Sequence, residues 1–225
     1  MYTDTNPDLY ISITSVMDRG TALVLENCED GIFIKDTVSG LYMLACRRTD
    51  TAKQWLVKHE GDYGVVVTFD SHAADFVKSR YGLCNTLECY QAVYAHTTAP
   101  QIKADLDVRN ATKEDFDFVA AVYNKVSPEE LKEIINRNQL FIATKDSRII
   151  GFAGQHLEGS LGILEVMPEY RGNGYGKYLE VFMIDHMLKK GQKPFCQVET
   201  FNKISLELQK KLGYNITTEK VYFIY

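Results

Sequence analysis

The chain has 225 residues, of which 45% are hydrophobic and 24% charged, and its formal net charge is −5. This composition, with no biased tract, excludes a disordered, collagen-like or coiled-coil protein. The negative charge and the lack of a basic stripe argue against a nucleic-acid partner. No apolar run approaches the roughly 20 residues of a membrane span. Aspartates stand where a secretory signal needs basic and apolar residues, so we expect a cytoplasmic protein without membrane contact.

The five cysteines are odd in number, scattered, and form no C-x-x-C pair. We therefore expect buried, reduced thiols rather than a disulfide framework. The histidines lack the paired spacing of metal ligands, and we predict no metal site.

The first half of the chain predicts three strands, a helix, and then a strand–helix–strand unit. "TALVLENCEDGIFIKDTVSGLYMLAC", residues 21–46, reads as three strands joined by turns at "EDG" and "VSG". "RRTDTAKQWLVKH" follows directly as a helix, without a glycine loop. Residues 63–94 then read as a short strand, an amphipathic helix stopped by Gly82, and a second strand.

A domain boundary is expected in "HTTAPQIKAD", residues 96–105, where polar residues and Pro100 interrupt the periodicity. We therefore predict one domain over residues 1–100 and a second over residues 105–225. The second begins with the strand "LDVRN", followed by two helices. "TKED" resembles a capping box, and "SPEE" offers a capping serine with a proline at the first helical position. Residues 139–166 read as three more strands, with turns at "KDS" and "EGS".

The ends of the two halves match at a constant offset. Residues 63–94 lie over residues 194–225 with the same order of strand, helix, glycine stop and strand, which pairs Val67 with Val198 and Gly82 with Gly213. We interpret the match as an internal duplication. The halves differ after their third strand, because only the second inserts "MPEYRGNGYG" before its helix.

The inserted glycines predict an anion-binding loop. The dinucleotide fingerprint fails because Lys177 stands at its third glycine position, and the nucleotide-triphosphate loop fails at Arg171 and Tyr178. What remains is R-x-x-G-x-G, which suits a pyrophosphate resting on backbone N–H groups at a helix start. The alternative is that the glycines only make a tight strand-to-helix turn.

These residues resemble a known family. "LEVMPEYRGNGYG" looks like the acyl-coenzyme A loop of the GNAT acetyltransferase superfamily, and "VETFNKISLELQKKLGY" looks like its later segment. The resemblance implies an α/β fold, the GNAT acyl-CoA N-acyltransferase fold, with a mixed central sheet flanked by helices. The duplicated layout resembles the glycine N-acyltransferase-like branch, in which a degenerate GNAT-like half without the CoA loop precedes the working half.

The resemblance also implies the residues that bind the cosubstrate, acetyl-CoA. The pantetheine arm would lie beside the strand that contains Leu164 and Val166 and pair with it as an extra strand does. The next core strand, "FCQVET", splays away in the family. Asn202 would bond the pantetheine chain, although an asparagine there is also suited to cap its helix. The residues of the loop itself are Arg171, Gly172, Asn173, Gly174, Tyr175 and Gly176.

Acetyl transfer to an amine needs a group that takes a proton. For an amine of pKa about 10.4, deprotonation at pH 7 costs roughly 4.6 kcal/mol. The first candidate is Glu158, because this branch of the family tends to place an acid in this turn, and the second is His156. The alternatives are a solvated turn glutamate and a strand-end histidine satisfied by its neighbours. Glu165 and Glu199 are weaker strand candidates.

One departure from the family leaves two functions open. Many relatives have a tyrosine on the last helix, thought to protonate the departing thiolate, and this chain has Gln209 there. A thiolate of pKa about 8.5 can leave unprotonated, so catalysis does not require that proton. We expect an N-acetyltransferase that moves the acetyl group of acetyl-CoA to a primary amine of a small molecule, amino acid or peptide. It would act as a monomer or homodimer. The alternative is a non-catalytic module that binds acyl-CoA as a sensor or scaffold.

Overall fold

The computed structural model describes residues 1–225 and contains two compact units. Unit one comprises Met1–Val93 together with Gln197–Tyr225, and unit two comprises Tyr94–Cys196. The elements of unit one are η1 (Tyr2–Thr5), α1 (Ile11–Asp18), β1 (Ala22–Cys28), β2 (Gly31–Asp36), β3 (Tyr42–Cys46), α2 (Thr49–Lys58), β4 (Val66–Thr68), α3 (Ser71–Tyr81), β5 (Thr86–Tyr94), α7 (Lys203–Leu212) and β11 (Tyr214–Ile224). Strand β10 (Phe195–Glu199) crosses from unit two into unit one.

The elements of unit two follow one another without interruption. They are β6 (Asp107–Asn110), η2 (Lys113–Asp115), α4 (Phe116–Val122), α5 (Pro128–Asn136), β7 (Leu140–Lys145), β8 (Arg148–Gln155), β9 (Leu161–Val166), η3 (Pro168–Tyr170) and α6 (Tyr175–Lys189).

Unit one is built on a mixed seven-stranded sheet in the order β1-β2-β3-β4-β11-β5-β10. Strands β3 and β4 run parallel, whereas β1 with β2, β2 with β3 and β4 with β11 run antiparallel. Strand β11, from the end of the chain, therefore lies between two strands of the first half. Sequence patterns did not predict this insertion.

Strand alternation places the core of unit one on both faces of this sheet. Ile32 and Ile34 pack with Ile13 and Val16 of α1. Phe33, between them in sequence, packs on the opposite face with helices α2 and α3. Each of these side chains is fully buried, which stabilises the fold by about 1.5–3 kcal/mol per residue.

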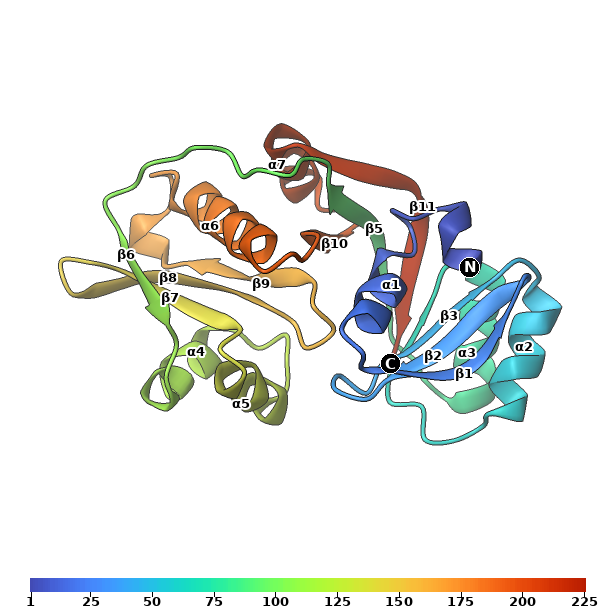
Figure 1. Ribbon diagram of the computed structural model, residues 1–225. Helices are drawn as coiled ribbons and strands as arrows, with labels where there is room; N and C mark the ends of the chain where they lie inside the picture. The colour runs from blue at the N-terminus through green and yellow to red at the C-terminus, as the bar shows by residue number, and fades with distance from the viewer. The chain divides into compact units, whose positions relative to one another are not determined.

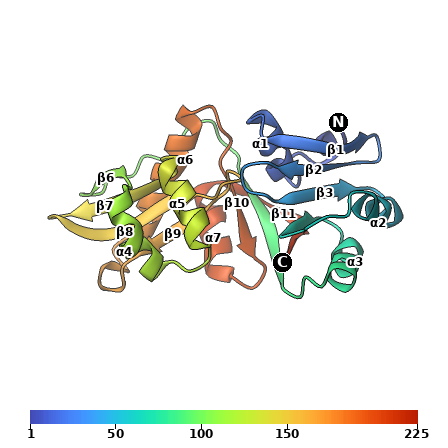
Figure 2. The same cartoon turned by 90° about the horizontal axis from the view of Figure 1, so that it is seen from below.

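Unit two is an antiparallel sheet in the order β6-β7-β8-β9, with helices on both faces. Helix α6 covers one face and α4 with α5 covers the other (Figures 1 and 2). The pairing of β8 with β9 shifts by one residue, so that Gly154 pairs with Ile163 and Gln155 pairs with Leu161. Gly162 is thus the extra residue of a β-bulge, a feature that redirects neighbouring side chains.

The predicted helix signals in unit two are confirmed. Thr112 and Asp115 form a capping box ahead of α4, around the short helix η2. The Ser127 hydroxyl accepts from the N–H of Glu130, with Pro128 at the first position of α5. The glycine stops are confirmed as well, since Gly82 and Gly213 end α3 and α7 in the left-handed conformation.

Asp115 is also held by a two-pronged ion pair that gives a testable pH dependence. Its carboxylate accepts from the Arg109 guanidinium at 2.7 and 2.8 Å and from the Thr112 N–H at 2.8 Å. The Arg109 hydrogen bond outweighs burial and lowers the pKa of Asp115 to about 2. A depressed pKa contributes stability that is present above pH 4 and is lost as the pH falls toward 2.

We expect the free energy of unfolding to fall by roughly 2 kcal/mol between pH 4.5 and 2 through Asp115 alone. This is an upper value because Arg109 is half exposed and its charge is screened. Asp115→Asn should remove this part of the pH dependence, as measured by urea unfolding at both pH values. The exposed neighbour change Asp117→Asn is the control and should leave the slope unchanged. Equal slopes in all three proteins would contradict the assignment.

The expectation that the cysteines are buried needs a correction. Cys89 and Cys196 are buried, but Cys28 and Cys84 are exposed. Cys28 is the last residue of the edge strand β1, and Cys84 lies in the connection between α3 and β5. The fold class is confirmed: this is an α/β protein with a mixed central sheet flanked by helices.

Candidate functional site

The glycine loop, residues 171–176, connects η3 to α6 in unit two. Gly174 is the N-cap of α6 with φ +80°, and Gly172 has φ +81°. Residues other than glycine rarely adopt this left-handed backbone conformation. With Gly172 and Gly174 on either side of Asn173, successive backbone N–H groups turn to one side of the chain. The predicted concentration of glycine is therefore required by the shape of the loop.

Two side chains hold the loop in this shape. The Arg171 guanidinium donates to the carbonyl oxygen of Val166 at 3.0 Å and to the Glu165 carboxylate at 2.7 Å. The Asn173 amide donates to the carbonyl oxygens of Tyr170 and Arg171 at 3.0 and 3.3 Å. Arg171 thus ties the loop to the end of β9 through Val166 and Glu165, and Asn173 closes the loop on its own backbone.

Backbone donors of the loop point away from the helix. The N–H of Tyr178 is the first in α6 that bonds to a carbonyl of its own turn, that of Gly174 at 3.1 Å. The N–H groups of Tyr175, Gly176 and Lys177 precede the first acceptor that a helix can offer. A Cβ added to Gly172 or Gly174 would meet no atom within 4 Å, so the space beside the loop is open.

Neither the backbone conformation nor the packing of the protein requires a glycine at position 176. Its φ is not in the left-handed region, and an added Cβ would meet only Val166 at 3.7 Å and Leu164 at 3.9 Å, which are ordinary contacts. A glycine inside a helix costs about 0.5–1 kcal/mol relative to alanine. The missing side chain therefore weakens α6 without any gain in packing.

Strand β9, which carries Leu164 and Val166, has one edge without a neighbour in its sheet. It is the last strand of the order β6-β7-β8-β9. The equivalent strand of the first half, β3, is paired along both edges, with β2 and in parallel with β4. Of these two equivalent strands, only β9 has an edge that can pair with an additional extended chain.

Asn202 belongs to unit one, where it caps α7. Its side-chain oxygen accepts from the N–H of Ser205 at 3.1 Å, so the capping interpretation is confirmed. This bond uses only the amide oxygen of Asn202, so the two N–H groups of the same amide can donate to another acceptor. The nearby Phe201 and Ile204 are 75% and 86% exposed.

Glu158 and His156 lie in the tight turn between β8 and β9. Glu158 is buried, with 6% of its surface exposed, and accepts from the Ser160 hydroxyl. The interpretation of Glu158 as a solvated turn residue is therefore wrong. Backbone bonds from the His156 N–H to the Ser160 carbonyl and from the Gly159 N–H to the His156 carbonyl, both 2.9 Å, close the turn.

His156 meets two residues that sequence patterns did not single out for this role. Its Nδ1 lies 3.9 Å from a carboxylate oxygen of Glu130 on α5, an ion-pair distance rather than a hydrogen bond. Its Nε2 lies against Gly162, where an added Cβ would be only 2.5 Å away. Burial lowers the pKa of His156, but Glu130 and the charge of Glu158 raise it by more, against an opposing effect of Lys125.

Tyr123 completes this group of side chains. Its hydroxyl donates to the carbonyl oxygen of Gly162 at 3.2 Å, and burial together with the charges of Glu130, Glu158 and Glu165 raises the pKa of its phenol. We call Tyr123, Glu130, His156, Glu158, Ser160 and Gly162 the His156 cluster. Glu130 was visible in the sequence only as an acidic residue in the first turn of a helix.

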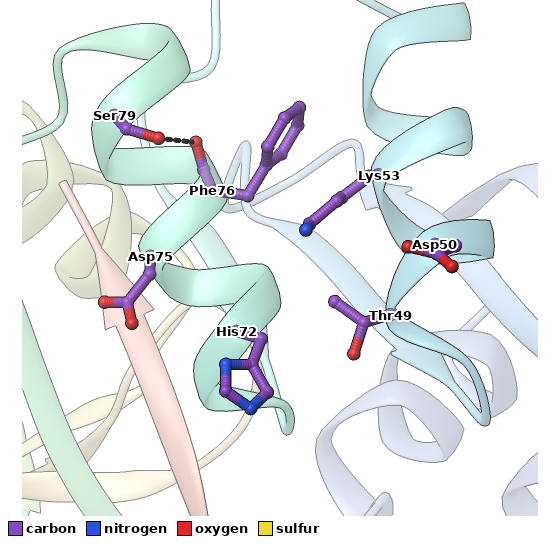
Figure 3. Close-up of a pocket in the computed structure, with 7 residues that line it drawn as sticks. All are labelled: Thr49, Asp50, Lys53, His72, Asp75, Phe76 and Ser79. Atoms are coloured by element: carbon purple, nitrogen blue, oxygen red, sulfur yellow. Dashed lines mark hydrogen bonds between the residues drawn. The ribbon is translucent and has the colours of Figure 1, made fainter.

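A groove of 620 Å³ in unit one contains none of the predicted site residues. It lies between α2 and α3 and is lined by Thr49, Asp50, Lys53, His72, Asp75, Phe76 and Ser79 (Figure 3). Asp75 is paired with Lys78 at 2.8 Å, and the Ser79 hydroxyl donates to the Phe76 carbonyl within α3. These groups are satisfied locally, and we assign them no function.

No group of three or more histidine, cysteine, aspartate or glutamate side chains is arranged to hold a metal ion. No helix has the length and apolar content needed to cross a membrane.

The C-terminal part of the chain matches a known protein family. Residues 143–224, from β7 to β11, match the family model described as FR47-like protein. The match includes the glycine loop, His156, Glu158 and Asn202. It excludes Tyr123 and Glu130, which precede it.

Solved structures resemble the chain over nearly its whole length. A Drosophila protein shares 14% identity with a TM-score of 0.74, covering 99% of this chain and 92% of that one. A GCN5-related N-acetyltransferase-like protein from Streptococcus suis shares 15% identity with a TM-score of 0.57, covering 94% and 92%. An acetyltransferase of the GNAT family from Colwellia psychrerythraea shares 14% with a TM-score of 0.55, covering 96% and 97%. The fold is therefore the one found in GNAT acetyltransferases.

Proposed function

We propose that the protein is an acyl-CoA-dependent N-acyltransferase that moves an acetyl group from acetyl-CoA to a primary amine of a small molecule, amino acid or peptide. The observation that carries the proposal is the glycine loop with its outward donors, open space and a Gly176 that packing does not require. A diphosphate resting on the loop accounts for all three, because its oxygens approach closest where no Cβ intervenes. Five free cysteines fit a cytoplasmic setting.

Each predicted cofactor residue has a part in this proposal. The N–H groups from Gly172 to Gly176 bind the diphosphate, while Arg171 and Asn173 hold the loop in shape. The open edge of β9, at Leu164 and Val166, pairs with the amides of the pantetheine arm. The Asn202 amide donates to the same arm.

The His156 cluster supplies the acid–base chemistry. The amine nitrogen bonds to the acyl carbon, the C–S bond breaks, and CoA leaves as a thiolate. The proton lost by the amine goes to Glu158 or His156, and it later reaches the thiolate or solvent. An amine with a pKa near 8 costs only about 1.4 kcal/mol to deprotonate at pH 7, so α-amines are easier acceptors than lysine-like ones.

A second candidate function is binding of acyl-CoA without transfer. Gln209, buried where many relatives have a tyrosine, favours it because an amide cannot deliver a proton to the thiolate. The purified protein should be incubated with acetyl-CoA, a panel of amines and a thiol reagent, and products identified by mass spectrometry. Release of CoA above the blank with any amine supports the enzyme. Binding of CoA with no release would leave the sensor or scaffold.

The two roles of Asn202 can be separated by two substitutions. Asn202→Asp keeps an oxygen for the Ser205 N–H, so the thermal midpoint should stay within a few degrees, but the amide donor is lost. Asn202→Ala loses both, at a cost of about 1 kcal/mol in stability. We expect both variants to weaken CoA binding several-fold in calorimetry. If Asn202→Asp binds CoA as tightly as the parent protein, the residue is a helix cap only.

We further propose that the chain arose by duplication and that the first half is a degenerate GNAT-like domain. In the match between the halves, β4 corresponds to β10 and β5 corresponds to β11. The inner strand order β4-β11-β5-β10 is therefore symmetric, because each strand and its counterpart stand at equal distances from the two ends of the order. This symmetry supports the proposal. The pairing of β3 with β4 leaves no edge for a pantetheine arm in the first half. This half therefore has a structural role in the proposal, with domains at residues 1–100 and 105–225.

A further inference from the structure

The His156 ring is held from two directions within unit two. Helix α5 begins at the capped Pro128, which places the Glu130 side chain in its first turn, 3.9 Å from Nδ1. On the other side, the bulge takes Gly162 out of the strand register. The edge of the His156 ring that carries Nε2 and Cδ2 lies where a side chain at position 162 would begin. An added Cβ would lie 2.5 and 2.7 Å from these two atoms.

The two candidate bases, Glu158 and His156, differ in their hydrogen bonds and in their exposure to solvent. The Glu158 carboxylate is turned into the protein and accepts from Ser160, itself fully buried. The His156 side chain keeps 22% of its surface exposed, and Glu130 keeps 33%. The His156 side chain is therefore more open to solvent than Glu158, and the charge of Glu158 raises the pKa of His156.

We propose that His156 accepts the proton of the attacking amine at Nε2 and that Glu130 is a positioning residue that holds the imidazole through Nδ1. The inference rests on the proposed acyl transfer and deepens it. As the amine nitrogen bonds to the acyl carbon and the C–S bond breaks, the amine proton passes to Nε2. The imidazolium then gives the proton to the thiolate or to water, and the free base is restored.

The charged and titratable groups around His156 set the expected pH dependence. They are Glu130 on α5, Glu158 in the turn, Lys125 between α4 and α5, and Tyr123 at the end of α4. The carboxylates raise the pKa of His156, so the base form appears at higher pH than for an ordinary histidine. Removing the Glu130 charge lowers that pKa and should shift the acid limb of kcat/KM to lower pH.

The test compares Glu130→Gln, Glu130→Ala and the exposed neighbour Glu129→Gln in the full chain. Glu130→Gln keeps the shape of the side chain without its charge, so we expect a shifted acid limb with kcat at high pH within about threefold of the parent. Glu130→Ala also frees the ring, and we expect a further loss of about tenfold or more in kcat. Glu129→Gln should change neither quantity.

A second measurement does not need turnover. NMR titration of the imidazole, assigned with His156→Gln, should give a pKa for His156 above that of an ordinary histidine in the parent and a lower one in Glu130→Gln. An active enzyme whose acid limb ignores Glu130→Gln, or an active His156→Gln, overturns this inference and leaves the proposed transfer standing. A protein that transfers to no amine overturns the transfer itself, even if the titration shows the pair.

Discussion

Replacement of Gly174 by glutamate is expected to weaken CoA binding by at least a hundredfold. The residue has φ +80°, and the backbone strain of a side chain there costs about 1–2 kcal/mol. The new carboxylate would also stand at the positive end of α6, where the proposal places a diphosphate of the same charge. Calorimetry with CoA and acetyl-CoA measures the loss.

Gly40→Glu is the matched control for this change. Gly40 has φ +77° and, like Gly174, no atom within 4 Å of an added Cβ, but it lies in the turn before β3 in unit one. It introduces the same strain and the same charge away from the loop. Equal CoA affinity in Gly174→Glu and Gly40→Glu would end the proposal that the loop binds a diphosphate.

Gly176→Ala adds a milder test of the same loop. The added methyl group fits, at 3.7 and 3.9 Å from its neighbours, and should stabilise α6 by about 0.5–1 kcal/mol. We expect CoA binding to weaken nonetheless, because the methyl group stands beside the diphosphate. A more stable variant with undiminished affinity would contradict the role of the open surface.

Gly162→Ala is expected to lower kcat about a hundredfold while leaving CoA affinity and folding nearly unchanged. The new Cβ would lie 2.5 Å from His156 Nε2, so the ring must move off the bulge and lose its present position beside Glu130. A displacement of about 1 Å in a group that transfers a proton costs on the order of a hundredfold in rate. Steady-state kinetics with the best amine acceptor measures the effect.

Two other glycines control for folding. Gly64→Ala adds its methyl group in open space and should change neither kcat nor stability. Gly151→Ala would bring a Cβ to 2.3 Å from the backbone oxygen of Glu165, which cannot turn away as a side chain does, so this variant should be clearly destabilised. Normal kcat in a folded Gly162→Ala would show that the position of His156 does not matter for the reaction.

Features encoded over a few residues could be predicted from the sequence. The caps at Thr112 and Ser127 and the glycine stops at Gly82 and Gly213 depend on neighbours within one helical turn, and they are confirmed. The glycine loop was recognisable because its donors and its left-handed residues are contiguous. Helix α1 was missed, although Ile13 and Val16 have the spacing of a buried helix face.

Features that join distant residues could not be predicted in this way. Glu130 and His156 are brought together by the packing of α5 beside the β8–β9 turn, and nothing in either local pattern indicates the other. The bulge at Gly162 depends on the register of two strands. The burial of Glu158 depends on which way a tight turn folds its side chain, and short patterns suggested solvent as readily as the interior.

The place of β11 has a consequence for how the molecule is made and dissected. Residues 1–94 contain β4 and β5, but the strand that joins them into one sheet ends at Ile224. An isolated N-terminal half would leave two strand edges unpaired in its centre, a condition that invites association with foreign chains. During translation the sheet of unit one cannot be completed until β11, near the C-terminal end, has been synthesised. Cleavage of the chain at the predicted boundary should therefore yield two fragments that fold only when they are mixed.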